Sequence, residues 1–254
     1  MTTSVLVTRP AGQAGALLEA LAAAGFGPLY HRPMLLLEPL ESLSPAQRQP
    51  LLDLDIYQHV IFISANAVRF GMARIDEYWP QLPAGLNWYA IGETTAQMLR
   101  ERGLSPLTPG QEMNTEGLLS LPQLQSVGDE RVLIVKGQGG RATLRQSLEQ
   151  RGARVDELAC YRRCCPQLPV QELPELLRDA AIDVVLISSG EGLGNMLTLL
   201  SAEETTKFSD IGLIVPSPRV AALAQQAGFN NVVTAANASD AAMLQALQQW
   251  QAGD

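Results

Sequence analysis

The stretch VLIVKGQGGR (132–141) carries residue types that could bind an anion. An apolar run ends at Lys136, and Gly137 begins a glycine-rich segment that leads to Arg141. Glycine lets the backbone approach a ligand closely, and backbone N–H groups at the start of a following helix favour negative charge. We therefore expect Lys136, Gly137 and Arg141 near an anionic ligand, although the same residues could simply make a tight turn.

The spacing of this stretch does not match the two common nucleotide-binding motifs. A Walker loop needs Gly-x4-Gly-Lys-Ser/Thr, and a dinucleotide fingerprint needs Gly-x-Gly-x-x-Gly. Here the lysine precedes the glycines and the third glycine is missing. An earlier stretch, VLVTRPAGQAG (5–15), has the same strand-to-helix form without the glycine spacing. The two stretches therefore indicate duplicated turns rather than a nucleotide site.

Small polar residues and arginines also follow the other expected strands, where helices should begin. In a doubly wound sheet the ligand lies beyond the carboxyl ends of the strands, and helix N-termini favour carboxylates by about 0.3–1 kcal/mol per exposed contact. Arginine adds bidentate hydrogen bonds. The alternative is that the hydroxyls only cap their helices and that Arg9 is a solvated strand end. The expected ligand-binding residues at these ends are Arg9, Ser64, Ala65, Asn66, Thr94, Thr95, Ser188, Ser189, Ser217 and Arg219.

The elements that must position these residues alternate between strands and helices. Nearly continuous apolar runs are typical of strands buried on both faces of a parallel sheet. Helix signals follow them. Thr94 or Thr95 lies at the N-terminus of a helix expected over 93–103, Ser217 with Pro218 should start a helix over 217–228, and Ser239 should start the last helix. The pattern predicts α/β domains of doubly wound type. The expected strands cover 4–8, 58–63, 87–91, 132–136, 183–187 and 211–215.

The chain repeats itself at a nearly constant offset. The residues around Val5 recur around Val132 at an offset of 127. At an offset of 124, VIFISANAV (60–68) recurs as VVLISSGEG (184–192), which pairs Ser64 with Ser188. AIGETTAQML and TEGLL recur at the same offset. Four segments repeated at a nearly constant offset indicate a duplicated domain, with halves at about 1–127 and 128–254.

Two proline-containing stretches interrupt the alternation at matching places in the halves. HRPMLLLEPLE (31–41) and CYRRCCPQLPVQELP (160–174) both have the character of extended crossings rather than sheet strands. We infer that the chain changes domain once in each stretch. One α/β domain should then comprise 1–37 plus 167–254, and the other should comprise 38–166.

Composition excludes several classes of protein. The chain has 254 residues, a net charge of −8 and no basic tract, so we expect neither nucleic acid nor an anionic membrane as a partner. No apolar run reaches the ~18 residues of a membrane span, and MTTSVLVTRPAG does not resemble a signal peptide. The three cysteines, spaced C-x3-C-C, indicate reduced thiols rather than a metal site. We expect a cytoplasmic monomer without metal.

Seven motifs follow one another along essentially the whole chain: VLVTRP, IFISANAV, AIGETTAQML, LIVKGQGGR, ELACYRR, LISSGEGLGNML and VPSPRVAALAQQAGF. Taken in order and spacing, they resemble those of the uroporphyrinogen-III synthase family. The resemblance implies two flavodoxin-like domains from an internal duplication, joined by two extended crossings. It also implies an active site in the cleft between the domains, no cofactor and no metal.

The resemblance further implies a lyase that acts on a polycarboxylate tetrapyrrole. Hydroxymethylbilane loses its terminal hydroxyl to give an azafulvene, the far pyrrole attacks to form a spirocyclic intermediate, and the ring recloses with ring D inverted. The product is uroporphyrinogen III. Because the free substrate closes by itself without inversion, the protein must chiefly hold the productive pose.

The resemblance matches Tyr161 with a tyrosine that assists departure of the hydroxyl, as a phenol placed near the leaving group could. We expect Tyr161 to lie at the second crossing, outside either sheet. A tyrosine that only packs there is the alternative.

Two other classes of function remain open at this point. One is a non-catalytic, two-domain protein that binds small molecules, and the other is a flavin or nucleotide enzyme on the same fold. Neither half ends its first strand with the acidic pair that a response regulator needs. Contact with the preceding enzyme of the pathway is also left open.

Overall fold

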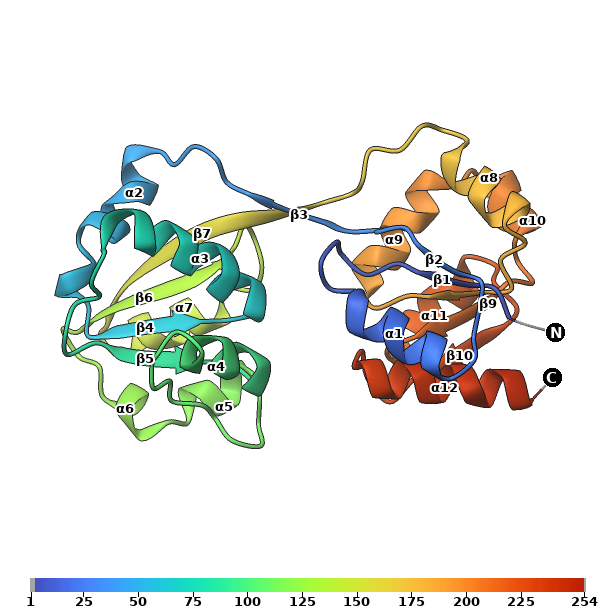
Figure 1. Ribbon diagram of the computed structural model, residues 1–254. Coiled ribbons are helices and arrows are strands. Elements are labelled where there is room, and N and C mark those ends of the chain that lie inside the picture. Colours follow the sequence, from blue (N-terminus) through green and yellow to red (C-terminus); the bar gives the residue numbers. More distant parts are fainter. Residues whose placement is uncertain (1–2, 254) are drawn as a thin grey trace. The chain divides into compact units, whose positions relative to one another are not determined.

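The computed structural model describes residues 3–253, and the chain divides into two compact units (Figure 1). The first unit takes the chain up to Leu37 and again from Cys164 onward, and the second takes Glu38–Arg163. The sequence had predicted that 164–166 would belong to the second unit, whereas the contacts place these residues in the first. In the part of the chain described, no helix is long and apolar enough to cross a membrane.

The first unit is a five-stranded sheet with the order β10-β9-β8-β1-β2. All neighbouring strands are parallel. Counted along the chain, this order is 2-1-3-4-5, as in flavodoxin-like folds. The strands are β1 (Val5–Val7), β2 (Leu29–His31), β8 (Val184–Leu186), β9 (Gly212–Val215) and β10 (Val232–Thr234).

Helices cover both faces of this sheet, because successive strand residues point to opposite sides. Val5 and Val7 pack in one apolar cluster with α1 and α12, and Leu6 packs in the other with α8, α9 and α11. Figure 1 shows the two helical layers on this unit. The helices are α1 (Gly15–Ala23), α8 (Glu172–Asp179), α9 (Gly190–Leu199), α10 (Ala202–Lys207), α11 (Pro218–Gln226) and α12 (Asp240–Ala252).

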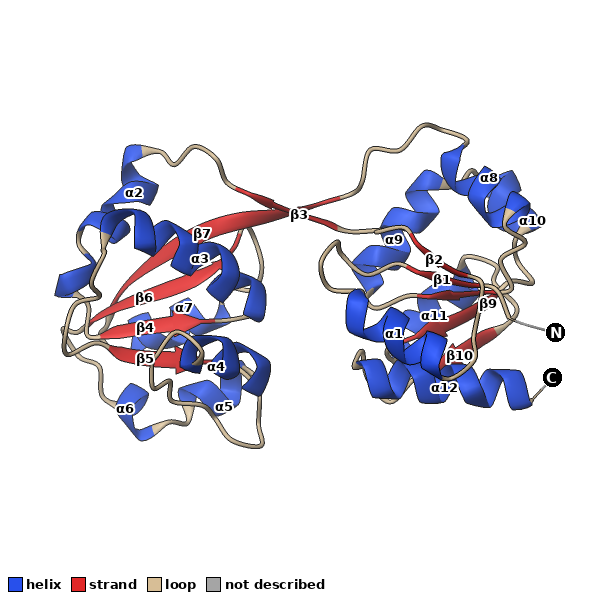
Figure 2. Cartoon of the chain, viewed as in Figure 1, coloured by secondary structure: helices blue, strands red, loops and turns tan. Residues whose placement is uncertain are grey.

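The second unit is a five-stranded sheet with the order β3-β7-β6-β4-β5 (Figure 2). The pairs β7-β6, β6-β4 and β4-β5 are parallel. The strands are β3 (Leu36–Pro39), β4 (His59–Phe62), β5 (Asn87–Ala90), β6 (Arg131–Gly137) and β7 (Arg154–Cys164).

In this unit too, helices pack on the sheet from both sides. Residues of α5, α6 and α7 pack on the face that carries Val132 and Ile134. On α3, Gly71 faces the side chains of Val135 and Phe62. The helices are α2 (Pro45–Leu52), η1 (Leu54–Ile56), α3 (Ala65–Tyr78), α4 (Glu93–Arg100), α5 (Thr115–Leu119), α6 (Pro122–Gln125) and α7 (Thr143–Gln150).

The two sheets repeat the same order of duplicated strands. β9-β8-β1-β2 of the first unit corresponds to β5-β4-β6-β7 of the second. An isolated parallel bridge between Tyr89 and Leu107 stands where the first unit has β10. Each unit therefore combines strands from both halves of the sequence. The predicted fold class, two doubly wound parallel-sheet domains of duplicated origin, is confirmed.

The expectation that 31–41 and 160–174 contain no sheet strand was wrong. The first stretch includes the end of β2 and all of β3, and the second includes the end of β7. The prolines mark strand ends rather than interruptions, since β3 ends at Pro39 and Pro166 follows β7. Pairing with β6 holds the eleven-residue β7 in the sheet as far as Tyr161.

Helix starts agree with the sequence signals only in part. Ser239 caps α12 by accepting from the Ala242 N–H at 3.3 Å, and Pro218 is the first residue of α11. Ser217 occupies the N-cap position of α11 without a side-chain hydrogen bond. Thr94 and Thr95 lie in the first turn of α4, as predicted, and the N-cap residue of this helix is Gly92.

Candidate active site

The parallel strands gather the predicted site residues at the carboxyl edges of the two sheets. In the first unit they follow β1, β8 and β9. In the second unit they follow β4 and β5, lie at the end of β6, or come shortly after it. The first-unit group is Arg9, Ser188, Ser189, Ser217 and Arg219. The second-unit group is Ser64, Ala65, Asn66, Thr94, Thr95, Lys136, Gly137 and Arg141, with Tyr161 on β7.

Tyr161 belongs to the sheet, where it pairs with Gly137 of β6. The expectation that it lies outside either sheet was therefore wrong. Tyr161 is only 5% exposed, and its ring stacks on Phe70 of α3 with the ring centroids 5.2 Å apart. A Cβ on Gly137 would lie 2.7 Å from Tyr161 Cζ. The ring is thus held between Phe70 and the bare backbone of Gly137.

The phenolic oxygen of Tyr161 lies 3.2 Å from Ser64 Oγ. Ser64 is also the N-cap of α3, and its Oγ accepts from the Ala67 N–H at 3.0 Å. A hydroxyl has one proton and two lone pairs, so Ser64 can cap the helix and still donate to Tyr161. In that arrangement the phenolic proton of Tyr161 is left for another acceptor.

The first turn of α3 adds backbone donors beside this hydroxyl pair. The first N–H groups of a helix have no intrahelical acceptor, and Ala65 is the first residue of the fourteen-residue α3. The helix dipole also favours negative charge there. The arrangement suits an oxygen anion or a carboxylate next to Tyr161.

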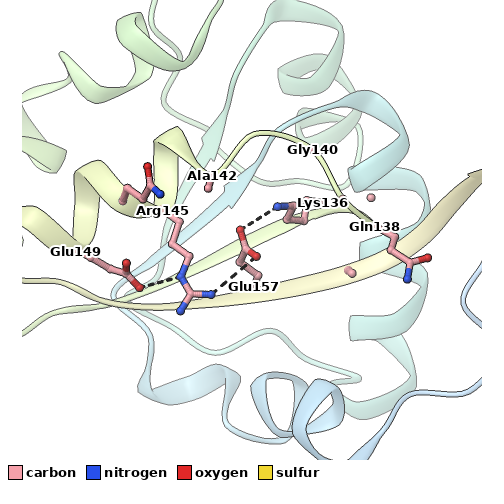
Figure 3. Close-up of a pocket in the computed structure, with 11 residues that line it drawn as sticks. Lys136, Gln138, Gly140, Ala142, Arg145, Glu149 and Glu157 are labelled. Atoms are coloured by element: carbon pink, nitrogen blue, oxygen red, sulfur yellow. Dashed lines mark hydrogen bonds and ion pairs between the residues drawn. The ribbon is translucent and has the colours of Figure 1, made fainter. Parts of the chain in front are cut away.

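Lys136 lies on the same edge, held by Glu157 of β7. Its Nζ donates to Glu157 Oε1 at 2.9 Å, and its side chain is only 9% exposed. Arg145 Nη1 lies 4.0 Å from Glu157 Oε2, and Arg145 Nε donates to Glu149 at 2.8 Å. Figure 3 shows these four side chains as one connected network.

Two hollows adjoin this network. One, of about 460 Å³, is lined by the glycine-rich segment 137–140 together with Arg145 and Glu157. The other, of about 200 Å³, has apolar walls and includes Arg141. Lys136, Arg145 and Glu157 line both hollows. Sequence reasoning missed Arg145 and Glu157, because only the pairing of β6 with β7 brings Glu157 near Lys136.

Cys160, the neighbour of Tyr161, is unsuited to act as a nucleophile. Cys160 is only 1% exposed, and burial raises the pKa of its thiol to about 12. The Sγ atom donates to the Lys136 carbonyl at 3.2 Å. Only thiolates are good nucleophiles, so at neutral pH this cysteine serves as a buried packing residue.

Arg9 in the first unit is engaged in the fold. It forms a salt bridge with Asp240 at the start of α12 and donates to the Ala238 carbonyl at 2.6 Å. The carbonyl of Arg9 itself lies 2.9 Å from His31 Nε2. These contacts anchor the start of α12, so a substrate contact by Arg9 stays a prediction.

The first unit offers a second hydroxyl-capped helix. Ser189 caps α9 by accepting from the Gly192 N–H at 3.0 Å, as Ser64 caps α3. The N-cap counterpart of Ser64 is therefore Ser189, one residue beyond the Ser188 that the sequence repeat had paired with it. Arg219 is exposed, and a Cβ on Gly190 would lie 3.4 Å from its Nη1. The starts of α9 and α11 are thus neighbours.

Comparison with known proteins gives a consistent result. The family model of uroporphyrinogen-III synthase HemD matches residues 15–245. The uroporphyrinogen-III synthase of Escherichia coli K12 is 32% identical over 250 residues, which cover 96% of this chain and all of that protein. The enzyme of Salmonella typhimurium LT2 is 31% identical over 247 residues, with the same coverage.

Solved structures share the fold at low sequence identity. A mutant uroporphyrinogen III synthase from the extremely thermophilic bacterium Thermus thermophilus aligns with a TM-score of 0.63 at 16% identity and covers both chains fully. Uroporphyrinogen-III synthetase from Helicobacter pylori 26695 gives a TM-score of 0.62 at 16% identity, over 98% of this chain and 99% of that one.

Proposed function

Because the chain belongs to the uroporphyrinogen-III synthase family, we propose that it closes hydroxymethylbilane to uroporphyrinogen III with ring D inverted, as a lyase that releases water. The observation within the chain that best supports this chemistry is the held phenol of Tyr161, 3.2 Å from Ser64 Oγ. The family membership supplies the substrate class, and the Tyr161 site supplies an acid suited to a leaving hydroxyl.

In the proposed first step, the C–O bond of the hydroxymethyl group breaks. The pyrrole nitrogen supplies electron density, and the departing hydroxyl takes the phenolic proton of Tyr161 and leaves as water. The N–H proton that the ring gives up as it becomes an azafulvene returns to the phenolate, so protons balance. Ser64 orients the phenol by donating to its oxygen, and stacking on Phe70 holds the ring.

The remaining requirement is a pose in which the substituted carbon of the far pyrrole is the nearer nucleophile. Hydroxymethylbilane carries eight carboxylates, and helix starts at the carboxyl edge of a parallel sheet offer backbone N–H groups for carboxylates. Positioning of this kind converts a flexible chain into a near-attack conformer and can lower the barrier by about 7–11 kcal/mol in favourable cases. We propose that this positioning, rather than strong acid or base chemistry, determines the isomer.

The test is an isomer analysis of the product. Purified protein is supplied with hydroxymethylbilane, and the oxidised products are separated into type I and type III isomers. The expected product is type III, and heat-denatured protein should yield only the type I isomer of spontaneous closure. Type I product at the spontaneous rate in the presence of folded protein would instead favour a non-catalytic binding protein.

Single hydroxyl deletions should leave most of the activity. Alanine at Ser64, Thr95, Ser188 or Ser217 is expected to lower kcat/KM by less than about a hundredfold, or under roughly 3 kcal/mol, because backbone donors share the positioning. Ser64→Ala should have the largest effect of the four, since it removes the contact with Tyr161. Steady-state kinetics of the four variants would contradict this if any folded variant lost all turnover.

Gly137→Ala should disturb Tyr161 without touching its hydroxyl. The added Cβ would lie 2.7 Å from Cζ and 3.0 Å from the phenolic oxygen, so the ring must move. A displacement of about 1 Å can cost about a hundredfold in rate, and we expect kcat to fall by that order. Gly128→Ala is the matched control in the same unit, because its Cβ would meet nothing within 4 Å. Equal kcat for the two variants would contradict the proposed role.

That the protein is a cytoplasmic monomer remains a prediction. The net charge of −8 favours a dispersed protein over self-association. Sedimentation of the purified protein should give a single species of monomer mass, and a concentration-dependent shift to larger species would overturn the prediction.

A further inference from the structure

The smaller hollow of the second unit has the features of a binding site for a flat apolar group that carries a carboxylate. Its volume is about 200 Å³, and its apolar walls are Ile63, Ile91, Ile134 and Leu144. Ile63 and Ile91 directly follow β4 and β5, Ile134 lies in the middle of β6, and Leu144 lies on α7. Three cationic side chains, those of Lys136, Arg141 and Arg145, line the same hollow together with Glu157.

Lys136 is an unusual residue for its place in the sheet. Side chains two apart on a strand share a face, so Lys136 extends the inward row of Val132 and Ile134 on β6, both of which belong to the apolar cluster. An apolar side chain would continue that row. The Lys136 side chain is 9% exposed and that of Glu157 is 27% exposed. A pair of this kind, formed by a buried ammonium group and a partly exposed carboxylate, usually stabilises a fold little, and apolar replacements are often neutral or stabilising. Fold stability therefore does not explain why Lys136 and Glu157 form an ion pair at this position.

The ammonium group retains the capacity to bind a ligand. It has three N–H donors, and Glu157 Oε1 accepts one of them at 2.9 Å. Within residues 3–253 no other protein acceptor lies in hydrogen-bond range of Nζ, and the Arg141 side chain has no ion pair there. Glu157 thus orients Lys136 while two N–H groups remain for an incoming anion.

We propose that this hollow holds one pyrrole ring of the substrate, with the carboxylate of an acetate or propionate substituent bound by Lys136 and Arg141. The proposal rests on the proposed function, which supplies a substrate made of such rings. The isoleucine and leucine walls contact the ring faces, and Lys136 anchors the carboxylate. Glu157 is a positioning residue that acts through Lys136.

The first test replaces Lys136 by methionine, which keeps the length and removes the charge. The KM for hydroxymethylbilane is expected to rise about 10- to 100-fold, the loss that follows removal of a charge-assisted hydrogen bond. The kcat should change little, because the contact is made equally in the ground and transition states. Lys207→Met is the matched control: Lys207 is the chain's other lysine, exposed on α10 and paired with Glu203. It should leave the KM unchanged.

The second test separates binding from folding. Lys136→Met/Glu157→Leu removes the pair together, so the double variant should melt at or above the wild-type temperature while its KM stays raised. A wild-type KM in either variant would overturn the proposed site. A lowered melting temperature that accounts for the kinetic loss would also overturn it, because the pair would then be structural.

The experiments distinguish failure of the proposed binding site from failure of the proposed function. Wild-type protein that makes type III product while Lys136→Met keeps its KM overturns the site alone. Wild-type protein that makes no type III product overturns the proposed function and this assignment with it.

Discussion

Tyr161→Phe is expected to lower kcat by about 10²–10⁴-fold, the usual contribution of a positioned general acid. The substitution keeps the ring, so the stacking on Phe70 and the packing against Gly137 remain. Only the phenolic O–H is lost, and with it the contact with Ser64 at 3.2 Å. Single-turnover kinetics with hydroxymethylbilane measure the loss directly.

The isomer of the residual product separates two roles for this tyrosine. Type III product is expected, because pose rather than protonation decides which carbon attacks. The melting temperature should stay near that of the wild type, since the ring is retained. Full activity in Tyr161→Phe would make Tyr161 a packing residue, and enzyme-dependent formation of type I product would assign it to positioning.

Gly71→Ala should destabilise the protein although alanine is the better helix former. Gly71 lies in the middle of α3, and a Cβ there would overlap Val135 Cγ1 of the central strand β6. Val135 is fully buried and cannot withdraw without moving the sheet. Overpacking of this kind typically costs about 1–3 kcal/mol, which exceeds the helix-propensity gain of up to about 1 kcal/mol.

Gly194→Ala on α9 is the control for helix propensity. It adds the same methyl group to a helix interior, but its Cβ would meet nothing within 4 Å. We expect this variant to gain about 0.5–1 kcal/mol. Urea unfolding followed by circular dichroism gives both free energies. A Gly71→Ala variant as stable as Gly194→Ala would show that α3 can move away from the sheet.

Local sequence signals were sufficient for the fold class. The six apolar runs correspond to β1, β4, β5, β6, β8 and β9, because strands buried on both faces lack polar alternation. Among the strands that these runs do not cover, β3 and β7 lie where prolines and charged residues break that pattern. β7 is half-exposed over much of its length, so its place in the sheet depends on pairing with β6 rather than on its own composition.

The residue types at strand ends were sufficient to predict candidate site residues, but not the side chains that contact them. Lys136, Arg141 and the hydroxyls after the strands were recognisable because a parallel sheet puts every carboxyl end on one edge. Glu157 was not recognisable, because it lies 21 residues from Lys136 and meets it only through the parallel register of β6 and β7. The N-cap role of Ser189 in place of Ser188 depended on where β8 ends.

The sequence by itself determined the duplication, which is visible as four segments repeated at offsets of 124 to 127 residues. It also determined the alternation of elements and the positions of the turns, since these depend on a few consecutive residues. Only the tertiary structure decided which half supplies which strand of each sheet. It also decided that Tyr161 lies in β7 against Gly137 and beside Ser64, 97 residues away. The physical reason is that strand pairing and side-chain contact join distant segments, and their register follows from the packing of whole faces rather than from any local pattern.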